Sequence, residues 1–105
     1  MSFSTKLKRE IADALTLLAP GIPFLDAEIV RKHAAAKHLR EFAPKISVWL
    51  ALIAHIRHAH TDYDELMDEG YGKESSRHFA LDQTNEKLTE WRATRFLEPD
   101  GNGDD

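Results

Sequence analysis

Residues 44–60, PKISVWLALIAHIRHAH, decide the fold that the sequence predicts. The segment opens with Pro44, which suits the first turn of a helix because the missing N–H would have no partner there. Apolar side chains then cover more than half of the circumference of a helix with about 3.6 residues per turn. They are Ile46, Val48, Trp49, Leu50, Leu52, Ile53 and Ile56. Such a helix must be mostly buried, so we expect it to be the central core element.

The segments before this helix also show helical periodicity. A first helix is expected over residues 4–19 and is ended by the turn PGIP, which cannot continue it. Asp26 is expected to be the N-cap of a second helix, because its side chain can accept a hydrogen bond from the first turn. The apolar pattern of that helix fades near Leu39.

Two more helices are expected after the central one. Asp62 is a good N-cap for a short helix that Gly70 ends, and a longer helix should span residues 73–96. No segment predicts a β-strand. The sequence therefore predicts an all-α, compact single-domain bundle of about five helices over residues 1–97, followed by a disordered acidic tail over 98–105.

Length and composition limit the number of domains, the kinds of metal site and the cellular location that we expect. A chain of 105 residues predicts one domain, and the absence of cysteine excludes disulfides and thiolate metal ligands. No apolar run approaches the roughly 20 residues that span a bilayer, and the first residues do not resemble a signal peptide. We therefore expect a cytoplasmic protein that does not enter a membrane.

The net charge of −4 hides a strong segregation of charge. Residues 31–60 carry six basic and one acidic side chain, whereas residues 61–105 carry five basic and thirteen acidic ones. We favour an interpretation in which the basic helices pack beside the acidic C-terminal part. The alternative is an anionic partner such as nucleic acid. Its phosphates would be contacted by Arg31, Lys32, Lys37, Arg40 and Lys45.

The stretch IAHIRHAHTDYDELM, residues 53–67, gathers the side chains that could carry chemistry. His55 and His58 are three residues apart, so both imidazoles can lean toward one point on the helix surface. His60 and a nearby carboxylate could complete a divalent metal site with an open position for an activated water. A metal-dependent hydrolase built on these three histidines is therefore one hypothesis.

Structural roles also explain these residues without a metal. On a helical wheel His60 falls in the apolar arc, where a hydrogen-bonded histidine near the core is expected. The carboxylate would come from Asp62 or Asp64, but these also suit the N-cap and the first turn of the next helix. Arg57 is expected to brace the two helices through a charge-assisted pair with these aspartates, in preference to binding an anion. Because no phosphate loop or catalytic triad pattern is present, our leading hypothesis is a non-enzymatic module that binds a protein partner or a second copy of itself.

Residues 56–70, IRHAHTDYDELMDEG, strongly resemble the signature of the domain of unknown function family 2293. Further similar positions are Pro23, EIVRKHA at 28–34, Arg77 and LTEWR at 88–92. The resemblance covers about residues 20–92 and implies no catalytic residues, because the activity of the family is unassigned. The link KHLR at 37–40 is shorter than in many relatives, which carry an insertion at this point.

Overall fold

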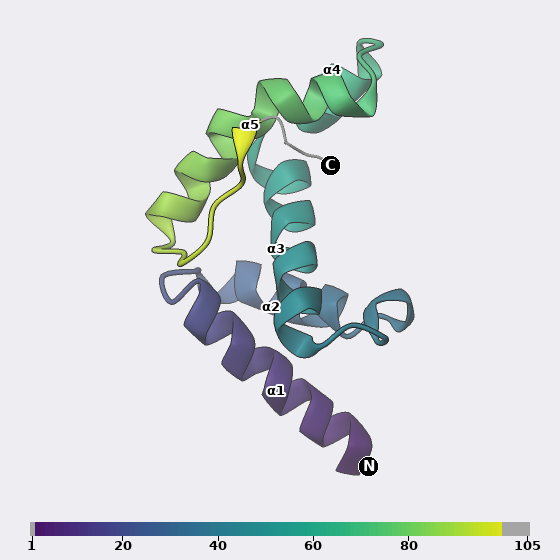
Figure 1. The fold of residues 1–105 in the computed structure, drawn as a ribbon, viewed down its shortest axis with the longest axis vertical. Coiled ribbons are helices and arrows are strands. Elements are labelled where there is room, and N and C mark those ends of the chain that lie inside the picture. Colours follow the sequence, from purple (N-terminus) through teal and green to yellow (C-terminus); the bar gives the residue numbers. More distant parts are fainter. Residues whose placement is uncertain (1, 100–105) are drawn as a thin grey trace.

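The computed structural model describes residues 2–99, with side chains from residue 5 onward, and the regular elements in this range are all helices. They are α1 (Ser2–Leu18), α2 (Phe24–Ala34), the short 3-10 helix η1 (Lys37–Leu39), α3 (Pro44–His60), α4 (Tyr63–Asp68) and α5 (Lys73–Glu90). In Figure 1, α1 and α2 lie against one half of α3, while α4 and α5 lie toward its other half. The prediction of an all-α bundle of about five helices is confirmed.

Helix α3 is the centre of the bundle, because each of the other four α-helices packs against it. It begins at Pro44 and ends at His60, which are the predicted bounds. Val48, Leu52 and Ile56 are completely buried along it. A buried central helix is therefore confirmed, although no other helix fully covers the side that carries Ile46 and Leu50.

The start of α2 differs from the prediction. The helix begins at Phe24, and its N-cap is Pro23, which makes no side-chain capping bond. Asp26 therefore lies inside the first turn and is not the N-cap. Because the Asp26 carboxylate does not cap α2, it can form hydrogen bonds with side chains of α3.

The end of α5 also differs, since the helix stops at Glu90 and does not continue to Phe96. Arg92 has a positive φ of 58°, and the Ala93 N–H donates to the Leu88 carbonyl at 2.8 Å. This backbone pattern ends many helices, usually with glycine at the left-handed position. An arginine there gives no sequence signal, so the prediction ran past the true end.

The segment after α5 is hydrogen-bonded to the turn between α1 and α2. The Trp91 carbonyl accepts a hydrogen bond from the Gly21 N–H at 2.8 Å, and the Thr94 N–H donates to the Leu18 carbonyl at 2.9 Å. A Cβ atom at Gly21 would lie only 3.0 Å from the backbone of Trp91, so the close approach requires glycine. Trp91 is thus held in place, with its side chain only 2% exposed.

The last described residues run back beside α5 (Figure 1). Leu97 is anchored there, because its backbone exchanges two hydrogen bonds with the side chain of Asn85. From residue 100 onward the predicted acidic tail over 98–105 lies outside the described residues. Within the described range, none of the helices combines the length and the apolar character needed to cross a membrane.

Candidate functional site

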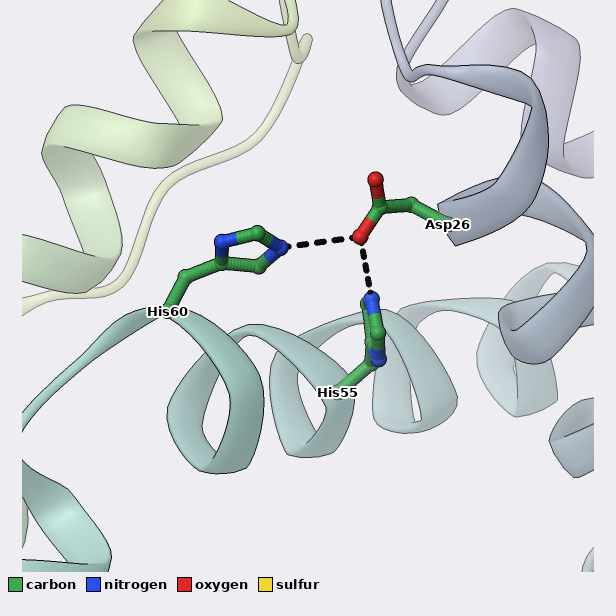
Figure 2. A group of neighbouring side chains, drawn as sticks. All are labelled: Asp26, His55 and His60. Atoms are coloured by element: carbon green, nitrogen blue, oxygen red, sulfur yellow. Dashed lines mark hydrogen bonds and ion pairs between the residues drawn. The ribbon is translucent and has the colours of Figure 1, made fainter.

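One carboxylate oxygen joins two histidines at the crossing of α2 and α3. Oδ1 of Asp26 accepts hydrogen bonds from Nε2 of His55 at 2.6 Å and from Nε2 of His60 at 2.8 Å (Figure 2). Because an ionised carboxylate can only accept, each ring must carry a hydrogen on its Nε2 atom. We call these three residues the Asp26 cluster.

The sequence spacing of the two histidines explains why the cluster is not obvious. Residues five apart on a helix point about 140° away from each other, so His55 and His60 do not share a face. They converge because the first turn of α2 lies beside the C-terminal half of α3, and Asp26 reaches the space between the rings (Figure 2). A residue from another helix therefore creates the site.

Trp91 forms one wall of the Asp26 cluster. Its ring stacks with the His55 ring, with centroids 6.4 Å apart, and meets the His60 ring edge-on at 5.3 Å. The two imidazoles also meet each other edge-on at 5.5 Å. Since Trp91 is itself fixed by the turn between α1 and α2, the rings have little freedom to rotate away from the carboxylate.

Burial and charge in the cluster act in opposite directions on Asp26. The side chains are 7% exposed for His55, 19% for Asp26 and 27% for His60, so the site lies at the edge of the core. Burial alone would raise the pKa of Asp26, but the hydrogen bonds from His60 and His55 outweigh it and hold that pKa below its ordinary value. The carboxylate is therefore ionised at neutral pH.

His58 does not join this cluster. Its Nδ1 atom lies 2.6 Å from Oδ1 of Asp64, and both side chains are more than half exposed. The pair links the end of α3 to the first turn of α4. The structure therefore brings His55 together with His60 and Asp26, and it does not form the expected grouping of His55 with His58.

Asp62 occupies the N-cap position of α4, as predicted, but its side chain does not cap the helix. The Asp62 backbone N–H donates to Oε1 of Gln83 on α5 at 2.9 Å, and Oδ2 of Asp62 accepts from Nε2 of the same glutamine at 3.0 Å. Oγ1 of Thr61 accepts the Tyr63 N–H in its place. Asp62 is thus remote from the Asp26 cluster in its contacts and ties α4 to α5.

The predicted brace between Arg57 and the aspartates of the junction is wrong. The Arg57 guanidinium lies over the Tyr63 ring, 5.5 Å from its centroid, and forms no ion pair with Asp62 or Asp64. Both aspartates are occupied by other partners, which explains the difference. Burial, together with repulsion from Arg77, lowers the pKa of Arg57 from its ordinary value.

The basic side chains gather around the corner formed by α2, η1 and the start of α3. They are Arg31, Lys32, Lys37, Arg40 and Lys45, of which all but Arg31 are exposed. Arg31 pairs with Glu28 of its own helix at 2.9 Å. In the described residues, no lysine or arginine of 31–60 forms an ion pair with an acidic residue of 61–99. Among the described residues, no ion pair therefore supports the favoured interpretation that the basic helices pair with the acidic C-terminal part.

Asp26 is the site residue that the sequence interpretation missed. Capping rules gave it a sufficient structural role, and no spacing rule connects residue 26 with residues 55 and 60. A weak signal did exist, because His60 was expected to be a hydrogen-bonded histidine near the core. Such a histidine needs a hydrogen-bond partner, and Asp26 is an acidic candidate on a neighbouring helix.

The fold and this site define a class: a small all-α module in which a carboxylate on one helix binds two imidazoles on the central helix. The family model of DUF2293, described as an uncharacterized conserved protein, matches residues 14–92. The chain therefore belongs to this family, and the matched range contains the whole Asp26 cluster. No curated protein and no solved structure matches the chain.

Proposed function

We propose that this chain is a non-enzymatic interaction module that self-associates through the outer face of α2. The observation that carries the proposal is the exposure of three large apolar side chains at the start of this helix. Phe24 is 70% exposed, Leu25 74% and Ile29 51%. Leu25 and Ile29 are one helical turn apart, so they form a continuous surface. Soluble monomers rarely leave such surfaces uncovered unless they bind a partner.

The charges on α2 support a second copy of the chain as that partner. Glu28 lies in the first half of the helix and pairs with Arg31 of the same helix, while Lys32 in the last turn forms no ion pair with a described residue. A twofold axis that pairs two α2 helices in antiparallel orientation brings the basic end of each beside the acidic half of the other. The apolar side chains then pack at the centre of the interface and the charges lie at its rim, as in known interfaces.

Sedimentation velocity over a wide range of protein concentration tests this proposal. We expect a monomer–dimer equilibrium for the unmodified chain and a monomer for the variants Leu25→Asp and Ile29→Asp. Leu50→Asp is the matched control, because Leu50 is also apolar and 41% exposed but lies on α3. A strictly monomeric unmodified chain overturns the proposal, as does a dimer that only the Leu50 variant dissociates.

Nucleic-acid binding is a second candidate, favoured by one observation. Lys32, Lys37, Arg40 and Lys45 are all exposed around the α2–η1–α3 corner, and none of them forms an ion pair with a described side chain. Contacts to phosphates predict binding that weakens steeply as salt rises. We expect Lys37→Glu and Lys45→Glu to reduce both the affinity for duplex DNA and its salt dependence. Absent or salt-insensitive binding excludes this function.

A further inference from the structure

The Asp26 cluster has the donor atoms of a transition-metal site. Its three potential ligand atoms, Oδ1 of Asp26 and one ring nitrogen each of His55 and His60, lie within 4.8 Å of one another. Imidazole nitrogen and carboxylate oxygen are ligands that Zn²⁺ and similar ions prefer. Both histidines come from a single rigid helix, and the aspartate comes from the helix packed against it (Figure 2).

The geometry needs only a small adjustment to accept an ion. Bonds from Zn²⁺ to nitrogen and oxygen are about 2.0–2.1 Å, so two ligand atoms in a tetrahedral site lie about 3.3 Å apart. The present distances from Oδ1 of Asp26 are 2.6 Å to His55 and 2.8 Å to His60. A widening of about 0.7 Å at the His55 contact and about 0.5 Å at the His60 contact makes room for the ion.

The proton balance is also simple. Each ring now carries its hydrogen on Nε2, where the ion would bind. On binding, a neutral imidazole changes to the tautomer with the hydrogen on Nδ1, and the Nε2 lone pair becomes the ligand. Asp26 is already ionised. No covalent bond of the protein is broken, and no net proton is lost from neutral rings.

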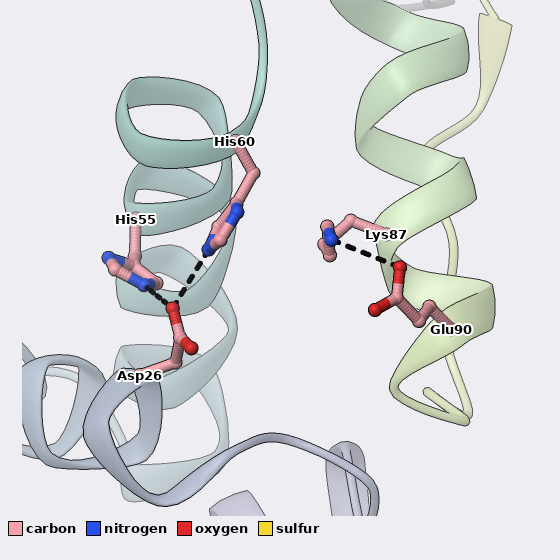
Figure 3. A network of polar contacts seen from close by, with 5 residues as sticks. All are labelled: Asp26, His55, His60, Lys87 and Glu90. Atoms are coloured by element: carbon pink, nitrogen blue, oxygen red, sulfur yellow. Dashed lines mark hydrogen bonds and ion pairs between the residues drawn. The ribbon is translucent and has the colours of Figure 1, made fainter.

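The surroundings combine access with support. Asp26 and His60 are partly exposed, so an ion can enter from solvent, while His55 is nearly buried and stacked on Trp91. Figure 3 shows Lys87, paired with Glu90 at 3.0 Å, extending from α5 toward α3. The Lys87 ammonium lies 5.8 Å from the centroid of the Trp91 ring. Its ion pair with Glu90 reduces the repulsion that Lys87 would exert on a bound cation.

From this arrangement we infer that Asp26, His55 and His60 bind one divalent transition-metal ion of the Zn²⁺ class, leaving one position open to water. A bound ion would cross-link the first turn of α2 to the C-terminal half of α3. It uses the inward side of α2, so it is independent of self-association through the outer face. His58, although it is on the same helix, takes no part.

Isothermal titration with ZnCl₂ tests the inference, with protein purified without a histidine tag and freed of metal by a chelator. We expect one ion per chain, and a higher melting temperature in the presence of Zn²⁺. Loss of an outer-shell partner typically costs about 10–100-fold in metal affinity, so loss of a direct ligand should cost at least as much. Asp26→Asn and His60→Gln should show this loss.

His58→Gln is the matched control, because it removes a histidine from the same turn of α3 without touching the cluster. It should bind Zn²⁺ as the unmodified chain does. His60 is partly exposed, so His60→Gln should keep its fold and remain informative even if the Asp26 variant unfolds, which circular dichroism checks. No binding by the unmodified chain overturns the inference. Equal affinity of the His60 variant, or an equal loss in the His58 variant, also overturns it.

Discussion

Replacing Asp26 with asparagine should destabilise the fold by weakening the two hydrogen bonds that join α2 to α3. The substitution keeps the size of the side chain and removes its charge. In the present structure one oxygen accepts two hydrogen bonds, at 2.6 and 2.8 Å, from rings on another helix. The amide oxygen of asparagine can still accept from both rings, but it carries no charge, so both hydrogen bonds become weaker.

The magnitude follows from the strength of these bonds. A hydrogen bond to a charged group contributes about 1.5–3 kcal/mol, and charge-assisted bonds are roughly twice as strong as neutral ones. Two bonds that fall to about half their strength give a loss of roughly 1.5–3 kcal/mol. Since Asp26 is 19% exposed, some of this is screened by solvent. We expect a loss of about 2 kcal/mol in the free energy of unfolding, or a melting temperature lower by on the order of 10 °C.

Urea denaturation followed by circular dichroism measures this loss, in metal-free protein at neutral pH. Asp64→Asn is the control, because Asp64 also accepts a 2.6 Å bond from a histidine but is 56% exposed. Its loss should stay below about 1 kcal/mol. If the two variants lose the same stability, Asp26 does not hold α2 on α3 in the way described.

Three further outcomes test the fold. Gly21→Ala should cost about 1–3 kcal/mol in urea denaturation, because the added Cβ would lie 3.0 Å from the Trp91 backbone; an unchanged midpoint would contradict the close approach. Ser47→Ala should cost about 1 kcal/mol, since its buried hydroxyl donates to the Leu39 carbonyl at 2.8 Å, and hydrogen exchange should quicken around η1 but not at α5. Burial and the neighbouring histidines lower the pKa of His33, so the unfolded chain binds that proton more readily, and stability should fall as the pH drops from about 7.5 to 5.5. His33→Gln should flatten this slope, and an identical slope would exclude the assignment.

The sequence predicted those elements whose limits have chemical markers. Pro44 marks the start of α3, and the apolar run that follows explains why the helix is central. Gly70, with a φ of 103°, ends α4 as a left-handed cap, which few other residue types adopt easily. In both places local chemistry and tertiary structure favour the same conformation, so these helix limits can be predicted from a single sequence.

Prediction failed where tertiary contacts decide the outcome. Arg92 adopts the left-handed conformation because the segment after it packs on the α1–α2 turn, and its residue type does not reveal this. Asp26 looked like an N-cap because capping is a local rule, but Pro23 holds that position. The carboxylate instead binds rings about thirty residues away, and the helical wheel of α3 alone cannot identify an acceptor on α2.

The partner of His58 also depends on how the helices pack. Spacing along a helix says which side chains can share a face, and His55 and His58 satisfy that condition. The hydrogen-bond partner of each histidine is determined by the residue that faces it on the neighbouring helix. For His55 this is Asp26 on α2, and for His58 it is Asp64 on α4. The candidate site therefore required the packing of the helices to be known.

Long-range ¹H–¹⁵N spectra of the histidine rings in metal-free protein test most directly whether one carboxylate unites His55 and His60. Both rings should carry their hydrogen on Nε2, and Asp26→Asn should change the Nε2 signals of both rings together while the His58 signals stay as they are. If only one of the two rings responds to the substitution, or if neither does, the Asp26 cluster is not the single polar unit described here.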